Sequence, residues 1–171
     1  MTNRSRILAF AVACLLIVAP HGAAQAQAQD EDTKKILNHR LTVEQVRKVV
    51  AVNREVLALL EKDADFRKRA EAAQDADGIE ESIAAIEKVP QMTVLLKKHG
   101  ITARDYLLAQ MAMMSTSMTH EFISKGQMPA LPPGFPTHNV DFWKANYKDL
   151  QPLEAEWKKT MAELQKLRQS R

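Results

Sequence analysis

A cluster of methionines in the second half of the chain carries the most distinctive chemistry. Met111, Met113, Met114 and Met118 lie close together, and His120 follows. Soft thioether groups are ligands for Cu(I). At about 100° per residue on a helix, however, three of the methionines fall in an apolar row typical of core packing. That row is Leu107, Met111, Met114, Met118 and Phe122. The spacing therefore predicts a core seam, with Met111, Met114 and Met118 as the alternative copper ligands.

Aromatic side chains gather around a proline-rich segment near the C-terminus. Residues 128–137, called the strap below, contain four prolines and one glycine, which exclude a continuous helix. In one interpretation the final helix buries the strap and the aromatic residues are structural. In the other they line a surface for an apolar ligand or a protein, because exposed Trp and Tyr are favoured at binding sites. The candidate surface consists of Phe135, Asn139, Phe142, Trp143, Tyr147 and Trp157.

Motifs for catalysis or for a cofactor are missing from the sequence. His39, His99 and His138 lie in different segments, and no HExxH, GxSxG or Walker pattern occurs. Cys14, the only cysteine, lies in the apolar N-terminal segment, which removes disulfides and thiolate chemistry from a processed chain. The sequence predicts a protein that is not an enzyme and has no cofactor.

The N-terminus has the pattern of a cleavable secretory signal. Arg4 and Arg6 precede an apolar run over residues 7–18, and small residues around Ala26 follow. The run is shorter than the roughly 18 to 20 residues that a membrane-spanning helix needs. We expect residues 1–26 to be removed, with cleavage after Ala26 or alternatively after Ala28. The prediction is an exported protein in the periplasm or, alternatively, outside the cell, without a membrane span after cleavage.

The elements that position these residues are expected to be helices. The net charge of +3 falls to +1 without the two arginines, which gives no indication of a nucleic-acid partner. Residues 27–40 are polar without sustained periodicity and predict a flexible lead-in. Residues 41–171 predict one all-α domain, a small bundle of five or six helices. The expected helices cover residues 43–62, 63–70, 79–88, 90–99 and 102–126, with a last helical region over 139–169 that breaks before Pro152.

Two helix starts carry capping signals. Thr42 with Gln45, and Thr102 with Asp105, have the spacing of a capping box. Asn53 lies within the apolar stripe of the first of these helices, where we expect a hydrogen-bonded core amide.

The chain resembles a family of uncharacterised exported helical proteins of Gram-negative bacteria. The resemblance covers most of the chain after the signal and implies a helical fold and an exported location, without catalytic residues. It is carried by Gly100, Ile101, Thr102, Arg104, Asp105 and Tyr106, by Leu131, Pro132, Pro133 and Gly134, and by Asn139, Val140 and Phe142.

A shorter stretch is similar to another class of protein. Residues 41–45 match the LTxxQ motif of small periplasmic stress chaperones, helical proteins that shield unfolded clients. A capping box produces the same letters. The predicted function is a non-enzymatic exported protein that binds a protein or an apolar ligand, with an LTxxQ-type chaperone and a methionine-rich copper-binding protein as alternatives. The sequence leaves the partner and the oligomeric state open.

Overall fold

The computed structural model describes residues 23–73, 76–128, 130–131 and 135–169. These residues form helices and no strand, which confirms the all-α prediction. Eight helices are present within the described residues, so the expected number of five or six is wrong. They are α2 (Ala23–Asn38), α3 (Val43–Lys62), α4 (Ala64–Ala72), α5 (Ile79–Glu87), α6 (Pro90–Lys98), α7 (Ala103–Ser124), α8 (His138–Ala145) and α9 (Tyr147–Gln169).

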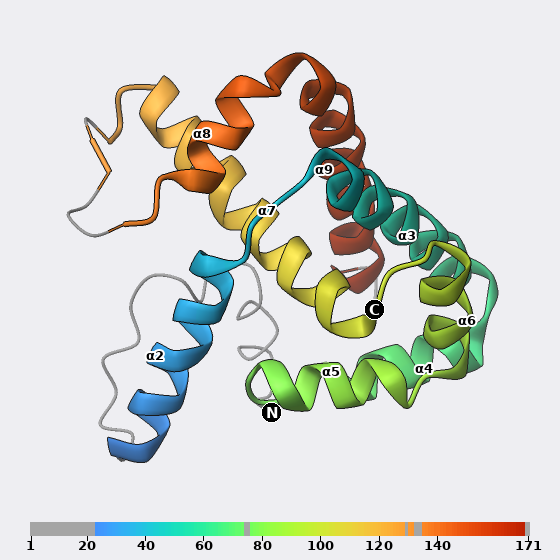
Figure 1. Cartoon of the computed structure of the whole chain (residues 1–171). Coiled ribbons are helices and arrows are strands. Elements are labelled where there is room, and N and C mark those ends of the chain that lie inside the picture. The colour runs from blue at the N-terminus through green and yellow to red at the C-terminus, as the bar shows by residue number, and fades with distance from the viewer. Residues whose placement is uncertain (1–22, 74–75, 129, 132–134, 170–171) are drawn as a thin grey trace.

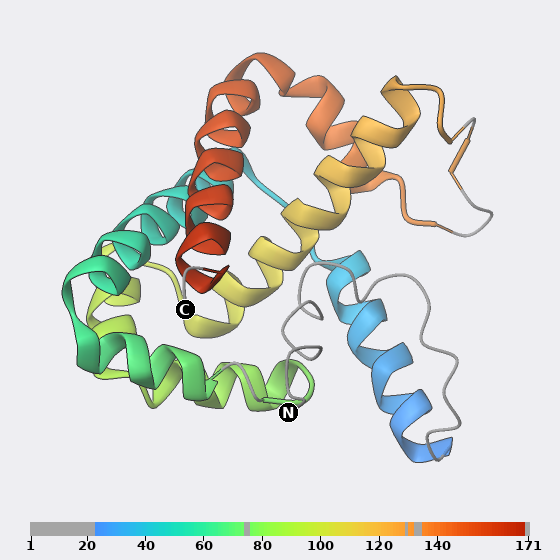
Figure 2. The same ribbon diagram turned by 180° about the vertical axis from the view of Figure 1, so that it is seen from behind.

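Helix α7 runs through the middle of the molecule and packs against α2, α3, α5, α6 and α8. Helix α9 lies beside α3 on one flank in both views (Figures 1 and 2). Most fully buried apolar side chains come from α3 and α7 with their neighbours, including Val46, Val49, Phe66, Met113 and Trp143. The core therefore lies between these helices. None of the described helices is both long and apolar enough to span a bilayer.

Local capping fixes where α3 and α7 begin. The Thr42 hydroxyl accepts a hydrogen bond from the backbone N–H of Gln45, and the Gln45 side chain accepts one from the Thr42 N–H. Thr102 accepts in the same way from the N–H of Asp105. The bonds from the Gln45 and Asp105 N–H groups satisfy donors that have no partner within their own helix. Both predicted helix starts are confirmed, and the full capping box forms at Thr42, whereas at Thr102 the Asp105 carboxylate accepts from the threonine hydroxyl.

Helix α2 replaces the expected flexible lead-in over residues 27–40. Asp32 accepts a hydrogen bond from the backbone N–H of Ile79 at 2.8 Å, at the N-terminus of α5. Gly78, the residue before Ile79, has no side chain that could cap the helix. A Cβ atom at Gly78 would lie 3.1 Å from the Asp32 carboxylate. A carboxylate at this end also interacts favourably with the helix dipole. Asp32 therefore acts as the cap of α5 from another helix.

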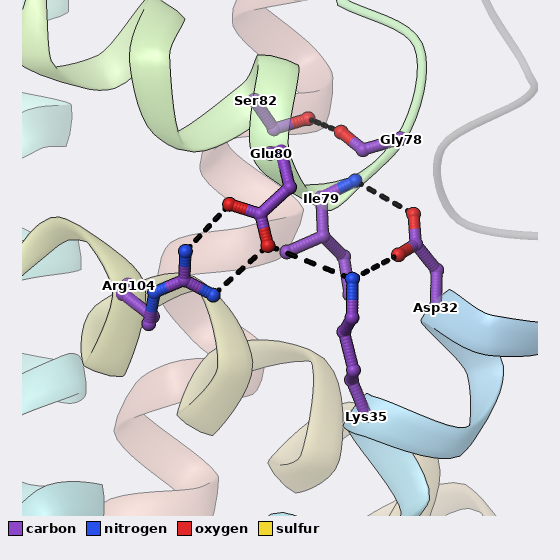
Figure 3. A network of polar contacts seen from close by, with 7 residues as sticks. All are labelled: Asp32, Lys35, Gly78, Ile79, Glu80, Ser82 and Arg104. Atoms are coloured by element: carbon purple, nitrogen blue, oxygen red, sulfur yellow. Dashed lines mark hydrogen bonds and ion pairs between the residues drawn. The ribbon is translucent and has the colours of Figure 1, made fainter. Parts of the chain in front are cut away.

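Ion pairs extend this contact to α7, as Figure 3 shows. Lys35 lies 3.1 Å from Asp32 and 3.5 Å from Glu80, and Arg104 donates two hydrogen bonds to Glu80 at 3.0 and 2.5 Å. Ile36 packs against the core. The lead-in prediction fails because α2 is stabilised by partners 45 or more residues away, which periodicity does not report.

The last helical region divides at Asn146, which separates α8 from α9. The Asn146 side chain and its backbone N–H both donate to the Phe142 carbonyl and end α8 there. Pro152 lies within α9. Because Pro152 is in the second turn, little helix precedes it, and α9 continues through the proline. The break expected before Pro152 thus lies at Asn146, where it divides the region into two helices, and this division together with α2 accounts for the larger number of helices.

Candidate functional site

Three of the residues predicted to form a binding surface belong to the interior. Trp143 is 0 % exposed, Trp157 7 % and Asn139 6 %. Both tryptophans are part of the core cluster, and Phe142 packs against it. Trp143 and Trp157 therefore lie on the inward faces of α8 and α9, which agrees with the structural interpretation of these residues and not with an exposed surface at their positions.

Asn139 joins two distant parts of the chain. Its side-chain oxygen accepts a hydrogen bond from the backbone N–H of Leu41 at 3.0 Å, and its side-chain nitrogen donates to the carbonyl of His39 at 2.7 Å. One amide therefore satisfies both a donor and an acceptor in the connection between α2 and α3. Its role is structural.

The two other residues of that surface, Phe135 and Tyr147, are accessible to solvent. Phe135 is half-buried in the strap. Tyr147 is 41 % exposed, and its ring lies 5.8 Å from the ring of His120 on α7, tilted by 31°. Of the LPPG letters in the strap, only Leu131 falls within the described residues. The structure therefore does not bring the predicted set together as one exposed patch.

The methionine of α7 that is fully buried is not one of those predicted to form the core seam. Met113, outside the predicted row, is fully buried. Met111 and Met114 are half-buried against the core, and Met118 is 39 % exposed. Because α7 has neighbours on several sides, its buried face is broader than the apolar row and includes Thr116 and Ser117. Among the described residues no group of three or more His, Cys, Asp or Glu side chains is arranged to hold a metal ion.

The motif residues at the start of α7 stabilise the scaffold. The Tyr106 hydroxyl donates to the Asn53 side-chain oxygen at 2.6 Å inside the core, and burial raises the pKa of that phenol. The nitrogen of the same Asn53 amide is buried without a hydrogen-bond partner within the described residues. The expected core amide is therefore satisfied at its oxygen. Arg104 and Thr102 serve the α5 contact and the helix cap described above.

A Ser, Glu and Lys cluster joins α7 to α9. Ser117 donates a hydrogen bond to Glu154, and Lys158 pairs with Glu154 at 3.0 Å and Glu121 at 3.3 Å. Partial burial opposes the charge on Lys158, yet the two carboxylates raise its pKa. Ser117 is only 2 % exposed, which leaves its hydroxyl inaccessible to a substrate in this conformation. These contacts tie two helices together.

An open groove lies between α3 and α6. It encloses about 610 Å³. Glu55 on α3 pairs with Lys98 at the end of α6, and Asp63 just after α3 contacts Gln91 at the start of α6. The two helices are therefore antiparallel. The groove is lined by Glu55, Ala58, Leu59, Lys62, Pro90, Gln91, Val94, Leu95 and Lys98.

The lining of the groove is largely apolar and partly exposed to solvent. Val94 is 70 % exposed, the largest fraction for any large apolar side chain in the described residues. Leu95 beside it is buried, and Leu59 is half-buried against the core. A concave surface with an apolar lining and a few polar side chains around it is the usual position of a binding site. The groove is therefore the candidate functional site.

Charged side chains stand at the two ends of the groove. Glu55 accepts hydrogen bonds from Lys98 at 2.9 and 2.7 Å and lies 2.9 Å from the His99 ring nitrogen. The hydrogen bond from Lys98 lowers the pKa of Glu55. Lys62 is exposed in the last turn of α3, at the opposite end. The charge of Glu55 is thus compensated within the protein.

The comparisons with known proteins add no assignment. Neither a protein-family model, nor a curated protein, nor a solved structure matches this chain. The resemblance to exported helical proteins stays a prediction. The LTxxQ letters have a local cause, since Thr42 and Gln45 form a capping box, and the chaperone alternative also stays a prediction.

Sequence reasoning missed the groove, although a signal for it was present. Residues 94–96 are three consecutive apolar residues on a helix, and a helix cannot turn all three toward one core. Leu95 and Leu96 are buried, and Val94 is left outside. An excess of apolar residues over what one face can bury was therefore the available indication.

Proposed function

We propose that the protein is a non-enzymatic, exported helical protein that binds an apolar segment of another protein in the groove between α3 and α6. The observation that carries the proposal is Val94, which is 70 % exposed in the largely apolar lining of a groove of about 610 Å³. A surface of this kind gains free energy when an apolar partner removes it from water. The proposal moves the binding site away from the strap and the last helix.

A neutral apolar dye, N-phenyl-1-naphthylamine, tests the groove. A Val94→Glu variant places a carboxylate in the lining, which should weaken dye binding roughly tenfold at a cost of about 1–2 kcal/mol. Folding should be unaffected because Val94 is exposed. Gln165→Glu on α9 adds the same charge at an exposed site outside the groove and is the matched control. Equal dye affinity in both variants would remove the groove from the proposal.

Export is the second part of the proposal. The support is the sequence pattern of Arg4, Arg6 and the apolar run over residues 7–18, and residues 1–22 lie outside the described residues. Mass spectrometry of the protein from fractionated cells should show a chain that begins at Gln27 or Gln29 in the periplasm or the medium. An intact Met1 start in the cytoplasmic fraction would refute export.

Copper binding is a second candidate function, favoured by the exposure of the thioethers. Met118 is 39 % exposed, and Met111 and Met114 are half-buried rather than enclosed. The three lie at helical spacings of three and four residues on one side of α7, where neighbouring side chains approach each other. Cu(I) should then raise the melting temperature, and Met118→Leu should remove most of the effect. No shift in the original protein would exclude this candidate.

A further inference from the structure

Helix α2 docks on α5 and α7 with little burial of its own side chains. Among residues 31–38, the part of α2 whose side chains the structure describes, none is fully buried. Ile36 and Leu37 are half-buried, and Ile36 packs against the core. The hydrophobic contribution of this part to docking is therefore small, because it scales with the apolar area removed from water. Short helices are only marginally stable by themselves in water, so α2, with 16 residues, depends on its other contacts.

The ion pairs around Glu80 (Figure 3) are open to water. The side chains of Lys35, Glu80 and Arg104 are all exposed. Exposed ion pairs contribute little to stability, and added salt weakens them. Asp32 differs, since its carboxylate is partly buried and accepts a charge-assisted hydrogen bond from the Ile79 N–H at 2.8 Å. Among the polar contacts in Figure 3, this bond is therefore the main attachment of α2 to α5.

The connection between α2 and α3 is held by bonds that do not involve α2. The Asn139 side chain binds the backbone of His39 and of Leu41. The capping box of Thr42 and Gln45 fixes the first turn of α3. All of these residues follow the end of α2 in the sequence. The start of α3 can therefore keep its position while α2 separates from α5.

We propose that α2 is a releasable arm, which separates from α5 and α7 and unfolds while the rest of the structure stays folded, and that the bond between Asp32 and Ile79 holds it in place. Ser82 donates its backbone N–H to the Gly78 carbonyl, in the first turn of α5. The Ile79 N–H precedes this bond and depends on Asp32 for its acceptor. Release of α2 therefore exposes this N–H and loosens the first turn of α5, so two segments 47 residues apart open together.

Amide hydrogen exchange, followed residue by residue by NMR at increasing urea concentrations, tests the proposal. The amides of Lys35 and Ile36 should be protected at least about tenfold less than the amide of Val50 in the core. Their protection should depend weakly on urea, because local opening exposes little surface, whereas the protection of Val50 should fall steeply. Added salt should speed exchange in α2 by weakening the ion pairs. Equal protection and equal urea dependence at all three amides would overturn the releasable arm, since α2 would then open only with the core.

Two alanine substitutions on α2 test the role of Asp32. Asp32→Ala removes the acceptor of the Ile79 N–H and should lower the protection of Lys35 and Ile36 by about five- to tenfold. Glu31→Ala is the matched control, since it removes a carboxylate from the adjacent exposed residue, and it should change the protection by less than about twofold. The NMR signals of α3 and α9 should keep their positions in both variants, as expected of a folded core. Equal losses of protection in the two variants would overturn Asp32 as the attachment.

Discussion

Replacing Asn139 by alanine separates its observed role as a buried clamp from the role of a surface contact. The substitution removes the acceptor of the Leu41 N–H, at 3.0 Å, and the donor to the His39 carbonyl, at 2.7 Å. Both groups belong to the backbone between α2 and α3. Alanine leaves both of them without this partner.

The magnitude follows from the burial of the two groups. Leu41 is 5 % exposed, so its unpaired N–H should cost about 1–3 kcal/mol. His39 is half-buried, and water can compensate part of the loss at its carbonyl. We expect a total loss of about 2–4 kcal/mol in the free energy of unfolding. A surface asparagine without such bonds would change it by no more than about 0.5 kcal/mol.

Urea denaturation followed by circular dichroism at 222 nm measures this loss. Asn146→Ala is the control, because it removes one local side-chain bond to the Phe142 carbonyl and should cost about 0.5–1.5 kcal/mol. Asn139→Asp should also destabilise, since it keeps the acceptor and replaces the donor by an oxygen that faces a carbonyl. A loss below about 1 kcal/mol for Asn139→Ala would refute the clamp.

Two further predictions concern the core hydroxyl and the connection before α3. Tyr106→Phe should lower the free energy of unfolding by about 1–3 kcal/mol because it leaves the buried Asn53 oxygen without its donor. Tyr147→Phe, at an exposed position, is the control and should change this free energy little. Similar losses for the two variants would contradict the prediction. Burial lowers the pKa of His39, so its neutral form stabilises the fold fully above pH about 6.5 and less as pH falls through the folded-state pKa. Unfolding measured between pH 7 and 5 should therefore show a smaller loss of stability for His39→Gln, and an identical pH profile would contradict the assignment.

Much of the helical fold could be predicted because its signals are local. Thr42 with Gln45, and Thr102 with Asp105, place the starts of α3 and α7 through bonds across one turn. Helix α2 could not be predicted in this way. Its determining contact joins Asp32 to the N–H of Ile79 across 47 residues, and nothing in the periodicity near Asp32 reports it.

The candidate site could be predicted less well than the fold, because residue type does not determine which way a side chain points. Tryptophan is a residue type favoured at binding surfaces, yet Trp143 and Trp157 are buried. Valine is a residue type favoured in cores, yet Val94 is 70 % exposed. Which side chains are buried depends on the orientation of α6, α8 and α9 about their own axes relative to the neighbouring helices. That orientation is set by the summed packing of the core and by pairs such as Glu55 with Lys98.

The residues that carry the family resemblance have roles in stabilising the fold. Gly100 ends α6 with a φ of 59°, Arg104 binds Glu80 on α5, and Asn139 fixes the connection before α3. None of these residues lines the groove. A chain that shares these letters is therefore expected to share the scaffold, whereas its partner would depend on residues of the groove such as Val94. A substitution at Val94 should then change dye binding and leave the helical content, measured by circular dichroism, unchanged.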